Sequence, residues 1–588
     1  MEIKRVFDLL QHQLEQFPQT DALAYKQHGS WIKYSTQDII EIVDSVSHGL
    51  LKMGIKNNDK IAIISQNRPE WNFIDLGVQQ IGAITVPIYP TITIEDYEYI
   101  FRDAGVRLIF VEGEELEQKA SEASRNLPEV EKIYTFDEIP GVAHWSEVKQ
   151  LGLNGDIQQL NDLRQQVRSS DLLTLIYTSG TTGDPKGVML THDNIISNAK
   201  AVSKISTLDG PNCRSLSFLP LCHIFERTAI YYYLLDGISV YYAESLDTIA
   251  QNLQEIAPDT FTTVPRLLEK VYEKIISKGY ELSGIKKNLF FWALNLGLKY
   301  DPNKKFGGWY RFQLNLANKI IFKKWREALG GNIKFITSGA AALQPRLCQV
   351  FWAAEIKVLE AYGLTETSPG ISFSTLEEMR VGCVGVLLDK VQVKIANDGE
   401  ILVKGPNVMK GYFNKAELTK QAIDDEGWFH TGDIGQFIEG KFLKITDRKK
   451  EIFKTSGGKY IAPQVIENVF KESNLIEQIM VTGEGEKFPS ALIVPNFDRL
   501  KEWCLHKGIS YTTDDQIVEE EFILEKFETE ISKYNQSFAQ YEKIKKFQLL
   551  SDSWDITSGE LTPTMKLKRK VIKEKYLSII KGFYINNE

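Results

Sequence analysis

The sequence predicts an α/β fold in which parallel sheets come first, an antiparallel region follows and a compact α+β segment ends the chain. In the first part, short apolar runs alternate with helical stretches of about 10 to 15 residues, the pattern of βαβ units and a parallel sheet. From about residue 391 apolar and polar residues alternate, as in 391–395 and 400–403, which indicates antiparallel strands. Beyond Asp447 the pattern is that of a compact α+β region.

Each element of the first part follows from a local pattern. The β-branched run at 60–65 predicts a strand. Pro69 then begins a stretch with helical apolar spacing, which predicts a helix over 69–81 because proline suits a first helical turn. The remaining predictions are a helix at 94–104 and strands at 83–88, 107–111, 215–218, 239–242, 260–264, 333–337 and 357–362.

The composition is that of a globular protein with a modest negative charge. Apolar residues make up 43% and charged residues 25% of the 588 residues, which excludes a disordered or fibrous chain. At roughly 150 residues per domain, the length corresponds to about four domain-sized units. The 69 Lys and Arg against 78 Asp and Glu give a net charge of −9, so no nucleic-acid partner is expected.

Cysteine usage and hydropathy point to the cytoplasm. The five cysteines never form a CxxC pair, so neither a disulfide framework nor a structural zinc site is expected. The first residues lead into an amphipathic helix pattern without the apolar stretch of a signal peptide. The longest apolar stretch, 289–298, is about half the length of about 20 residues that a spanning helix requires. We therefore predict a cytoplasmic protein that does not cross a bilayer.

A glycine- and hydroxyl-rich loop is the most informative stretch. It follows the apolar run at 175–177 and places three glycines, four hydroxyl side chains and one lysine within ten residues, 178–187. Such a loop can donate backbone N–H and hydroxyl groups to phosphate oxygens. It is not a Walker loop, because Pro185 precedes Lys186 and Gly187 follows it. We interpret it as a nucleotide-phosphate cradle; the alternative is a surface turn.

Further motifs follow this loop in order. Tyr-Gly-Leu-Thr-Glu-Thr occupies 362–367, Gly-Trp-Phe-His-Thr-Gly-Asp 427–433 and Asp-Arg-Lys-Lys 447–450, and 562–569 carries a lysine-rich run. Together with the loop at 177–188, they resemble the signature motifs of the AMP-forming (adenylating) enzymes, a family that includes acyl-CoA synthetases, non-ribosomal-peptide adenylation domains and luciferases. The resemblance covers nearly the whole chain.

The resemblance implies an architecture and a reaction. It implies a large AMP-binding domain over 1–446, which includes a small distorted β-barrel, and a smaller mobile C-terminal cap over 447–588. In the implied reaction a carboxylate attacks the α-phosphate of ATP, giving acyl-AMP and pyrophosphate, and the thiol of CoA then takes the acyl group. Catalysis of the first step would rest on positioning and charge neutralisation. ATP, Mg²⁺ and CoA are the cofactors and co-substrates that follow.

The resemblance also implies nucleotide contacts. Residues 178–186, which include Lys186, would hold the β- and γ-phosphates, and Thr365 would reach the α-phosphate. Glu366 with Thr178 would bind Mg²⁺, for which oxygen ligands beside phosphates are suited. Tyr362 offers a flat face to adenine; the alternative is a core tyrosine at a strand end. The implied ATP- or AMP-binding residues are Thr178, Ser179, Gly180, Thr181, Thr182, Gly183, Lys186, Gly339, Ala340, Glu360, Ala361, Tyr362, Gly363, Thr365, Asp433 and Arg448.

One lysine of the cap receives a role in adenylation. Lys566 resembles the family lysine that stabilises the transition-state charge; a solvated basic helix face is the alternative. The family usually has Ser-Gly before that lysine, whereas Thr564 and Met565 stand here. Lys568 is a neighbour that could take the role. The implied catalytic set is Lys566, Thr365, Glu366 and Lys186.

Other residues of the second half of the chain are assigned by the same resemblance. Lys450 occupies the hinge position, where one or two residues can absorb a domain rotation. Lys454 would be presented to the nucleotide after that rotation, and Gly457 and Gly458 would give the backbone freedom near the pantetheine path. Asp433 would take two ribose hydroxyls; the alternative is a β-turn aspartate.

The prediction of which carboxylic acid is the substrate rests on two sequence segments. Residues 218–227 and 263–272 resemble the long-chain fatty acyl-CoA synthetase branch. His223 and Gly339 would line the acyl pocket; the alternative for His223 is a core histidine. Arg227 stands where some long-chain synthetases carry a gating tryptophan, so no such gate is expected. No acidic residue appears where amino-acid-activating domains hold the α-amine, which favours an apolar-tailed acid.

Three alternatives accompany the prediction of a long-chain fatty acid–CoA ligase. The chain could be an acyl-AMP ligase that loads an acyl-carrier protein, a ligase for another apolar carboxylic acid, or a silent lipid- or nucleotide-binding protein on the same fold. Lys186, Glu366, Asp433, Arg448 and Lys566 together argue against the last reading.

The segment 286–326 combines basic and aromatic residues. It holds ten Lys or Arg and only one acid, Asp301, and aromatic residues lie between them, among them Phe290, Phe291, Trp292, Trp309, Tyr310, Phe312, Phe322 and Trp325. This pattern suits peripheral contact with an anionic membrane. Packed helices whose lysines face water explain it equally well.

Overall fold

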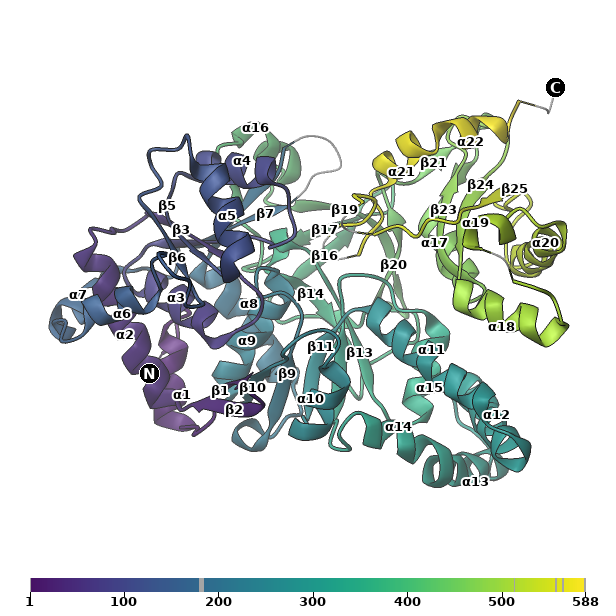
Figure 1. Ribbon diagram of the computed structural model, residues 1–588, viewed down its shortest axis with the longest axis horizontal. Coiled ribbons are helices and arrows are strands. Elements are labelled where there is room, and N and C mark those ends of the chain that lie inside the picture. Colours follow the sequence, from purple (N-terminus) through teal and green to yellow (C-terminus); the bar gives the residue numbers. More distant parts are fainter. Residues whose placement is uncertain (1, 179–183, 512, 556–557, 563–564, 586–588) are drawn as a thin grey trace. The chain divides into compact units, whose positions relative to one another are not determined.

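The chain divides into two units, called unit 1 and unit 2. Unit 1 consists of Met1–Lys394, Leu402–His430 and Ile438–Leu443, and unit 2 of Ile395–Ile401, Thr431–Phe437 and Lys444–Glu588. The computed structural model (Figure 1) describes residues 2–178, 184–511, 513–555, 558–562 and 565–585. The predicted α/β class, with a larger N-terminal and a smaller C-terminal part, is confirmed.

The first sheet of unit 1 is parallel in its centre and carries an antiparallel hairpin. Strands β4, β3, β5 and β6 run parallel, whereas β7 and β8 pair antiparallel. The sheet order is β18 (Gly411–Tyr412), β8 (Lys186–Thr191), β7 (Leu172–Thr178), β4 (Ile84–Pro87), β3 (Lys60–Ile64), β5 (Val106–Val111) and β6 (Lys132–Thr135). Between them, α3 (Pro69–Gln80), α4 (Ile94–Ala104) and α5 (Gly113–Ser124) make the crossovers.

Both faces of this sheet are buried, which explains the continuous apolar runs in its strands. In β3, Ile61 and Ile63 belong to one hydrophobic cluster and Ala62 and Ile64 to another. Side chains alternate between the two faces of a strand, so a strand with helices on both sides needs apolar residues at every position.

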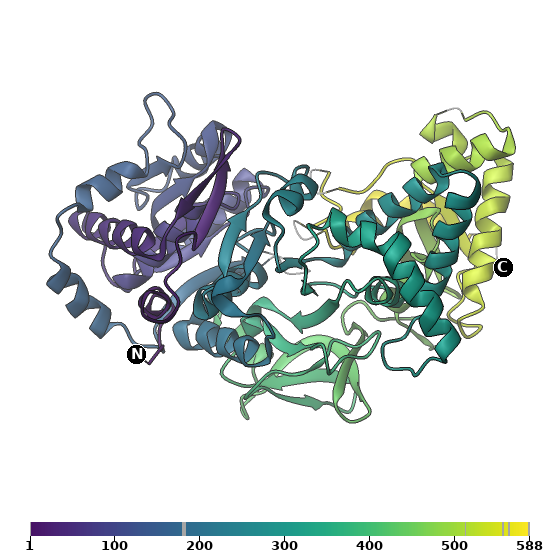
Figure 2. The same cartoon turned by 90° about the horizontal axis from the view of Figure 1, so that it is seen from below.

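The second sheet of unit 1 collects strands from distant parts of the chain. Its order is β15 (Val386–Leu387), β14 (Gly370–Phe373), β13 (Val358–Gly363), β12 (Phe335–Ser338), β11 (Thr260–Thr263), β9 (Arg214–Ser217), β10 (Ser239–Tyr242), β1 (Leu23–Gln27) and β2 (Ser30–Tyr34). The β1–β2 hairpin, dark purple in Figure 2, joins the sheet by parallel pairing of β1 with β10. One hydrophobic cluster contains residues of both large sheets and of α9 (Ile224–Asp236).

A helical insertion separates β11 from β12. It comprises α11 (Pro265–Glu281), α12 (Gly284–Leu298), α13 (Gly308–Ala317), a π-helical turn η2 (Asn318–Phe322) and α14 (Lys323–Ala328). These helices are grouped at the lower right of Figure 1. Within the described part of the chain, no helix has both the length and the apolar character that crossing a membrane requires.

The remaining strands lie in the antiparallel region and in unit 2. The predicted antiparallel region from about residue 391 forms a sheet in the order β16 (Gln392–Ile395), β17 (Glu400–Lys404), β19 (Phe429–Ile438) and β20 (Phe442–Arg448). Unit 2 adds the hairpin β21 (Phe453–Lys454) and β22 (Tyr460–Ile461) and a sheet in the order β23 (Ile476–Thr482), β24 (Ser490–Pro495) and β25 (Lys546–Leu549). Helices α17 (Pro463–Phe470), α18 (Phe497–Lys507), α20 (Glu521–Asn535), α21 (Arg569–Lys575) and α22 (Leu577–Gly582) accompany it. The domain boundary at 446/447 and the mobility of the cap stay predictions.

Candidate active site

The predicted phosphate loop connects the hairpin β7–β8. Thr178, the last residue of β7, pairs with Lys186, the first residue of β8. The predicted loop residues Ser179, Gly180, Thr181, Thr182 and Gly183 lie outside the described residues. The hairpin therefore brings Thr178 and Lys186 side by side at the base of the loop.

Close packing fixes the base of this hairpin. The hydroxyl of Tyr177 donates a hydrogen bond to Oδ2 of Asp103 at 2.6 Å. A Cβ atom at Gly187 would lie 3.0 Å from the ring of Tyr177 and 3.3 Å from Cβ of Phe413. The position thus favours glycine, and the glycine that follows Lys186 lets the two strands and Phe413 approach closely.

Tyr412 links the two charged residues of the predicted phosphate site. Its strand β18 pairs antiparallel with β8, with Tyr412 opposite Val188. The Tyr412 hydroxyl donates to Oε1 of Glu366 at 2.9 Å, and the Lys186 ammonium lies 5.3 Å from the centre of the Tyr412 ring. The Met409 N–H also donates to the Glu366 carbonyl at 2.8 Å. One buried tyrosine therefore contacts both the predicted metal ligand and the predicted phosphate lysine.

Burial keeps the Tyr412 phenol protonated. Desolvation raises its pKa well above the ordinary value, and the neighbouring carboxylate of Glu366 raises it further. The phenol therefore acts as a hydrogen-bond donor to Glu366. Tyr412 was not among the residues predicted from the sequence, because a Gly-Tyr pair in a short strand carries no local signal of its partner 46 residues away.

The end of β13 carries the other predicted nucleotide residues. Glu360 pairs with Ser338 of β12, and Tyr362 is buried at the strand end. A Cβ atom at Gly363 would lie 1.7 Å from the carbonyl oxygen of Pro369, so this position admits only glycine. The turn that follows leads into the short helix η3 (Thr365–Thr367), which holds both Thr365 and Glu366.

Glu360 is a buried acid rather than a surface ligand. Its side chain is nine-tenths or more enclosed, and burial raises the pKa of its carboxyl to about 8. The backbone carbonyl of Glu360 accepts from the N–H of Ser374, the residue after β14, at 2.8 Å. Any contact of Glu360 with a nucleotide stays a prediction.

The turn after β12 lies against the start of α9. A Cβ atom at Gly339 would lie 3.0 Å from the ring of Phe225 and 3.4 Å from the carbonyl oxygen of Ala361. Ala340 adopts a left-handed φ of 67°. His223 is the N-cap of α9, and its Nδ1 accepts from the N–H of Phe225 at 3.1 Å. The two predicted acyl-pocket residues, Gly339 and His223, therefore share Phe225 as a neighbour.

Arg227 lies in the interior of unit 1. Its guanidinium forms an ion pair with Asp75, both side chains being fully buried. It also donates to the hydroxyls of Thr174 and Tyr231, each at 2.8 Å. A buried charge with this many partners is fixed in place.

Glu226 precedes Arg227 in α9 and is, like Glu360 of β13, a buried acid. It accepts a hydrogen bond from Thr262, while its Oε1 has no hydrogen-bond partner among the described residues. Burial raises the pKa of Glu226 to about 7. The first turn of α9 therefore contains a carboxyl that is readily protonated.

In unit 2, Asp433 inside β19 lies next to Arg448 at the end of β20. Nε of Arg448, the last residue of β20, lies 3.1 Å from Oδ1 of Asp433. Asp433 is buried inside β19, so it is a strand residue and not a β-turn aspartate. Beside it, Lys449 lies 2.7 Å from Glu400, which also accepts from the N–H of Gly432 at 2.9 Å.

The predicted hinge occupies a tight turn. The N–H groups of Glu451 and Ile452 both donate to the carbonyl of Arg448, at 2.9 and 3.1 Å, so that Lys450 is exposed at the turn. Lys454 follows in β21, with its ammonium 5.4 Å from the centre of the Tyr460 ring.

The predicted glycine pair lies in the β21–β22 hairpin. Gly458 has a φ of 77°, in the left-handed region that favours glycine. A Cβ atom at Gly458 would lie 3.7 Å from Cε of Lys454, and one at Gly457 would lie 3.9 Å from the hydroxyl of Thr455. The hairpin thus holds Lys454, Gly457 and Gly458 close together.

Lys566 lies in a second tight turn of unit 2. Its N–H donates to Oγ1 of Thr562 at 3.0 Å, and the N–H of Thr562 donates to the carbonyl of Lys566 at 2.8 Å. The N–H of Lys568 donates to the Glu560 carbonyl at 2.7 Å, and Lys568 is the N-cap residue of α21. Lys566 therefore lies in the turn and Lys568 at the start of the helix.

A buried charged cluster connects this turn to the hinge. Arg569 donates to Glu451 at 2.9 Å and to Glu467 at 2.6 Å. Asp447 is buried nearby, where burial raises its pKa to about 7 and the two glutamates add to that rise. No sequence pattern indicates this cluster, because its members come from three separate segments of the chain, 447–451, α17 and α21.

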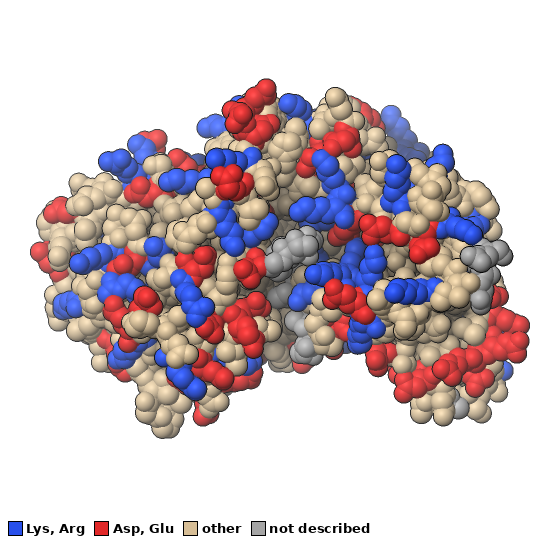
Figure 3. Space-filling view, turned by 90° about the horizontal axis from the view of Figure 1, so that it is seen from above, with Lys and Arg blue, Asp and Glu red and all other residues tan. Residues whose placement is uncertain are grey.

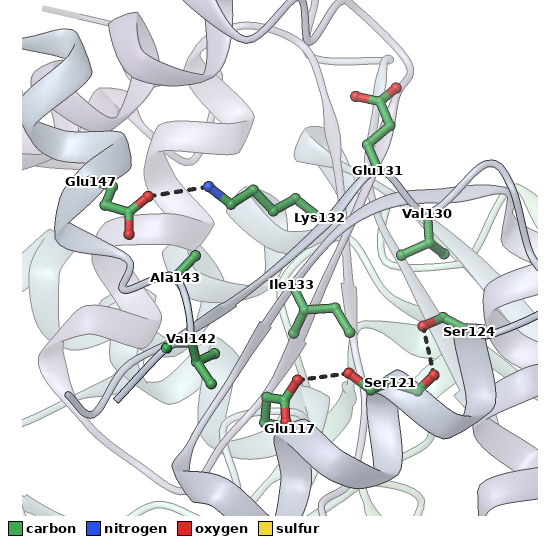
Figure 4. Close-up of a pocket in the computed structure, with 11 residues that line it drawn as sticks. Glu117, Ser121, Ser124, Val130, Glu131, Lys132, Ile133, Val142, Ala143 and Glu147 are labelled. Carbon is green, nitrogen blue, oxygen red and sulfur yellow. Dashed lines mark hydrogen bonds and ion pairs between the residues drawn. The ribbon is translucent and has the colours of Figure 1, made fainter. Parts of the chain in front are cut away.

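The pocket drawn in Figure 4 lies elsewhere, between α5 and β6. Its lining includes Glu117, Ser121, Lys132 and Glu147 and none of the predicted site residues. Lys132 and Glu147 are joined by an ion pair of 3.1 Å across it. Among the described residues, no group of three or more His, Cys, Asp or Glu is arranged to hold a metal ion.

Comparison with protein families gives two matches that together cover most of the chain. The description "AMP-binding enzyme" matches residues 10–413. The description "AMP-binding enzyme C-terminal domain" matches residues 450–588.

Similar curated proteins extend over almost the whole chain. The long-chain-fatty-acid–CoA ligase FadD15 of Mycobacterium tuberculosis is 32% identical over 562 residues, which are 95% of this chain and 93% of the relative. Long-chain-fatty-acid–CoA ligase 1 of Homo sapiens is 31% identical over 590 residues, covering 94% and 82%.

Solved structures share the fold at low sequence identity. The adenylation domain of a carboxylate reductase from Mycobacterium chelonae has a TM-score of 0.77 at 19% identity and covers 99% of this chain and 91% of that one. A Mycobacterium tuberculosis fatty acyl CoA synthetase has a TM-score of 0.64 at 19% identity, covering 98% and 99%. At this identity, the likeness concerns the fold alone.

Proposed function

This chain belongs to the AMP-binding enzyme family, and from that premise we propose that it is an AMP-forming long-chain fatty acid–CoA ligase. It activates the fatty acid with ATP to acyl-AMP, releases pyrophosphate and transfers the acyl group to CoA. The observation that carries this proposal is the 31–32% identity over more than nine-tenths of the chain to ligases of that name from a bacterium and from human.

Phosphate binding falls to the β7–β8 hairpin and η3. Lys186 neutralises the β- and γ-phosphates, and Thr365 contacts the α-phosphate. Glu366 and Thr178 would hold Mg²⁺, and their carboxylate and hydroxyl oxygens fit this ion, which commonly takes one or two carboxylates and completes its shell with water and phosphate. When bound, the metal neutralises charge that develops on the phosphates. Tyr362 provides the aromatic face for adenine.

Tyr412 positions Glu366 in this proposal. Its hydrogen bond of 2.9 Å engages one carboxylate oxygen of Glu366 and so restricts the rotation of that carboxylate. A carboxylate held by a buried neutral donor is oriented before the nucleotide arrives, which reduces the cost of ordering it during the reaction. Tyr412 is therefore a positioning residue rather than a ligand.

Unit 2 contributes the residues of the remaining steps. Asp433, oriented by Arg448 at 3.1 Å, accepts the ribose hydroxyls. Lys566 stabilises the charge that develops on the α-phosphate during adenylation. The cap, over 447–588, rotates at Lys450 between the two half-reactions, after which Lys454, Gly457 and Gly458 serve thioester formation.

The acid is long-chained and apolar in this proposal, and the protein is cytoplasmic with a peripheral contact to an anionic membrane. Gly339 and His223 line the acyl pocket. A long chain is favoured physically because each buried methylene contributes about 0.8 kcal/mol of transfer free energy.

Pyrophosphate release from ATP, measured across a panel of fatty, aromatic and amino acids, tests the proposal. We expect release with long-chain fatty acids and complete turnover only when CoA is added. Acyl transfer to a holo-carrier protein but not to CoA would make the chain an acyl-AMP ligase. Release with a different apolar acid alone would change the substrate, and no release with any acid would overturn the proposed function.

A further inference from the structure

The aromatic residues of the segment 286–326 divide into two groups in the structure. Phe290, Phe322 and Trp325 are buried in a hydrophobic cluster of unit 1, against which Phe291, Trp292 and Tyr310 pack while partly buried. Trp309 and Phe312 differ, being 72% and 59% exposed. The sequence pattern therefore combined a helical core with a much smaller exposed surface.

The exposed apolar residues form one stripe along α13 and η2. Trp309, Phe312, Leu316 and Ile320 follow one another at intervals of three and four residues, which places them on the same face of a helix. Leu316 and Ile320 are 39% and 43% exposed, and the Trp309 and Phe312 rings stack with their centres 5.6 Å apart. We call these four residues the α13 stripe.

Contacts on the opposite side of α13 fix the direction of the stripe. The hydroxyl of Tyr310 donates to the carbonyl of Leu296 in α12 at 2.7 Å, and the ring of Tyr310 stacks on Phe306 at 4.3 Å. Ala317 is fully buried. Because α13 is held to α12 on this side, the stripe stays outward and has no route into the core of unit 1.

Basic residues flank the stripe in the sequence. Residues 302–326 contain no Asp or Glu, and their basic residues are Lys304, Lys305, Arg311, Lys319, Lys323, Lys324 and Arg326. Arg311 directly precedes Phe312, and Lys319 directly precedes Ile320. Both basic side chains are exposed. By contrast, Figure 3 shows acidic and basic side chains interspersed over most of the face that it presents. The segment 302–326 thus differs in charge from the mixed surface seen in that view.

We propose that the α13 stripe is a membrane-docking surface that inserts Trp309 and Phe312 into the interface of an anionic lipid bilayer. A helix with exposed aromatic residues on one face and flanking Lys and Arg lies in the plane of such an interface, with its apolar face buried and its cations near lipid phosphates. The absence of acidic residues over 302–326 makes the charge complementary to an anionic surface and not to a mixed-charge protein surface. Docking would give the enzyme access to a substrate dissolved in the membrane, and in this respect the inference rests on the proposed function.

Flotation of the full chain with vesicles tests this surface. The vesicles are phosphatidylcholine alone or phosphatidylcholine mixed with phosphatidylglycerol. We expect co-flotation with the anionic vesicles, weakened by salt, and a loss of about tenfold in partitioning for the double variant Trp309→Ser and Phe312→Ser. Arg311→Gln with Lys319→Gln should weaken binding to anionic vesicles and remove much of its salt dependence.

The matched control is Leu151→Ser with Leu153→Ser, two apolar residues that are 45% and 49% exposed in another part of unit 1. This control should float like the unmodified chain. Equal flotation of the Trp309 and Phe312 variant would overturn the inference, as would equal binding to neutral and anionic vesicles. A change in sedimentation of that variant with unchanged flotation would assign the stripe to an interface between copies and would also overturn it.

Ligase activity separates this inference from the proposed function. With fatty acid supplied on albumin, the Trp309 and Phe312 variant should match the unmodified chain, whereas with fatty acid supplied in anionic vesicles it should be slower. An unmodified chain that floats but activates no acid would support docking and overturn the proposed function. An unmodified chain that activates fatty acid without floating would overturn docking alone.

Discussion

The hydroxyl of Tyr412 lies 2.9 Å from the carboxylate of Glu366, and the ring of the same tyrosine faces the ammonium of Lys186. Three segments meet in this arrangement: β8, which carries Lys186, η3, which carries Glu366, and β18, which carries Tyr412. A neutral donor between a carboxylate and a lysine orients the carboxylate without neutralising the lysine. Both charges thus stay available for a metal–nucleotide complex.

Replacement of Tyr412 by Phe should slow adenylation while the fold is retained. The ring keeps its contact with Lys186, but Glu366 loses a donor. Since a hydrogen bond to a charged group contributes about 1.5–3 kcal/mol, we expect a loss of about 10- to 100-fold in kcat/KM for ATP and a higher requirement for Mg²⁺. ATP–pyrophosphate exchange measures both.

Tyr241→Phe is the matched control for this prediction. Its hydroxyl also donates to a carboxylate, that of Asp21, at 2.6 Å, and it lies in the sheet of β10 rather than near β8. Exchange kinetics of this control should be unchanged. Similar losses in both variants would mean that the Tyr412 effect reflects stability and not the orientation of Glu366.

Lys566→Ala should separate the two half-reactions. The lysine acts on the charge that forms during adenylation, so pyrophosphate release should fall by about 10²- to 10³-fold. Thioester formation from supplied acyl-AMP should continue at nearly the normal rate. Equal losses in both halves would contradict this role.

Lys568→Ala decides between the two candidate lysines of the run. Lys568 lies at the N-cap of α21, beyond the turn between Thr562 and Lys566. We expect this variant to retain adenylation. A loss confined to adenylation in Lys568→Ala, with activity kept in Lys566→Ala, would transfer the role to Lys568.

The elements with strong local patterns were predictable from sequence. The helix at 94–104 and the strand at 239–242 agree with α4 and β10 to the residue, because apolar spacing and flanking turns define them locally. The β1–β2 hairpin was not predicted. Its place in the sheet depends on pairing between Leu23 and Val240, which no local pattern encodes.

The residues of the candidate site also fall into those that local sequence motifs predict and those that depend on the fold. Lys186, Glu366, Asp433 and Lys566 lie in motifs that are contiguous in sequence, so their resemblance to a family is readable. Tyr412 depends on pairing of a two-residue strand with β8, and its chemistry follows from burial beside Glu366. Burial and long-range pairing are properties of the fold, and sequence patterns register them only weakly.

Lys450→Pro should spare adenylation and impair thioester formation. Proline fixes φ near −65° and so removes the rotation that a hinge requires. Pyrophosphate release in the first turnover should remain within about twofold of normal, while acyl-CoA production falls by at least about tenfold. Lys450→Ala, which keeps a rotatable backbone, should retain both activities. Normal acyl-CoA production by the proline variant would show that Lys450 is not the hinge.

Asp447 should make the stability of unit 2 depend on pH. Burial raises its pKa from 3.8 to about 7, so between these values the folded state holds a proton that the unfolded state has lost. The free energy of unfolding therefore falls as the pH rises from about 4 to about 7 and then stays level, a loss of up to about 4 kcal/mol from this group. Asp447→Asn removes the titration, so the variant should gain stability relative to the unmodified chain between about pH 5 and about pH 8. Urea unfolding at about pH 4 and at about pH 7 measures the difference. The exposed-acid control Asp515→Asn should track the unmodified chain at both, and an Asp447→Asn variant that does the same would show that Asp447 titrates normally and that Arg569 fully compensates Glu451 and Glu467.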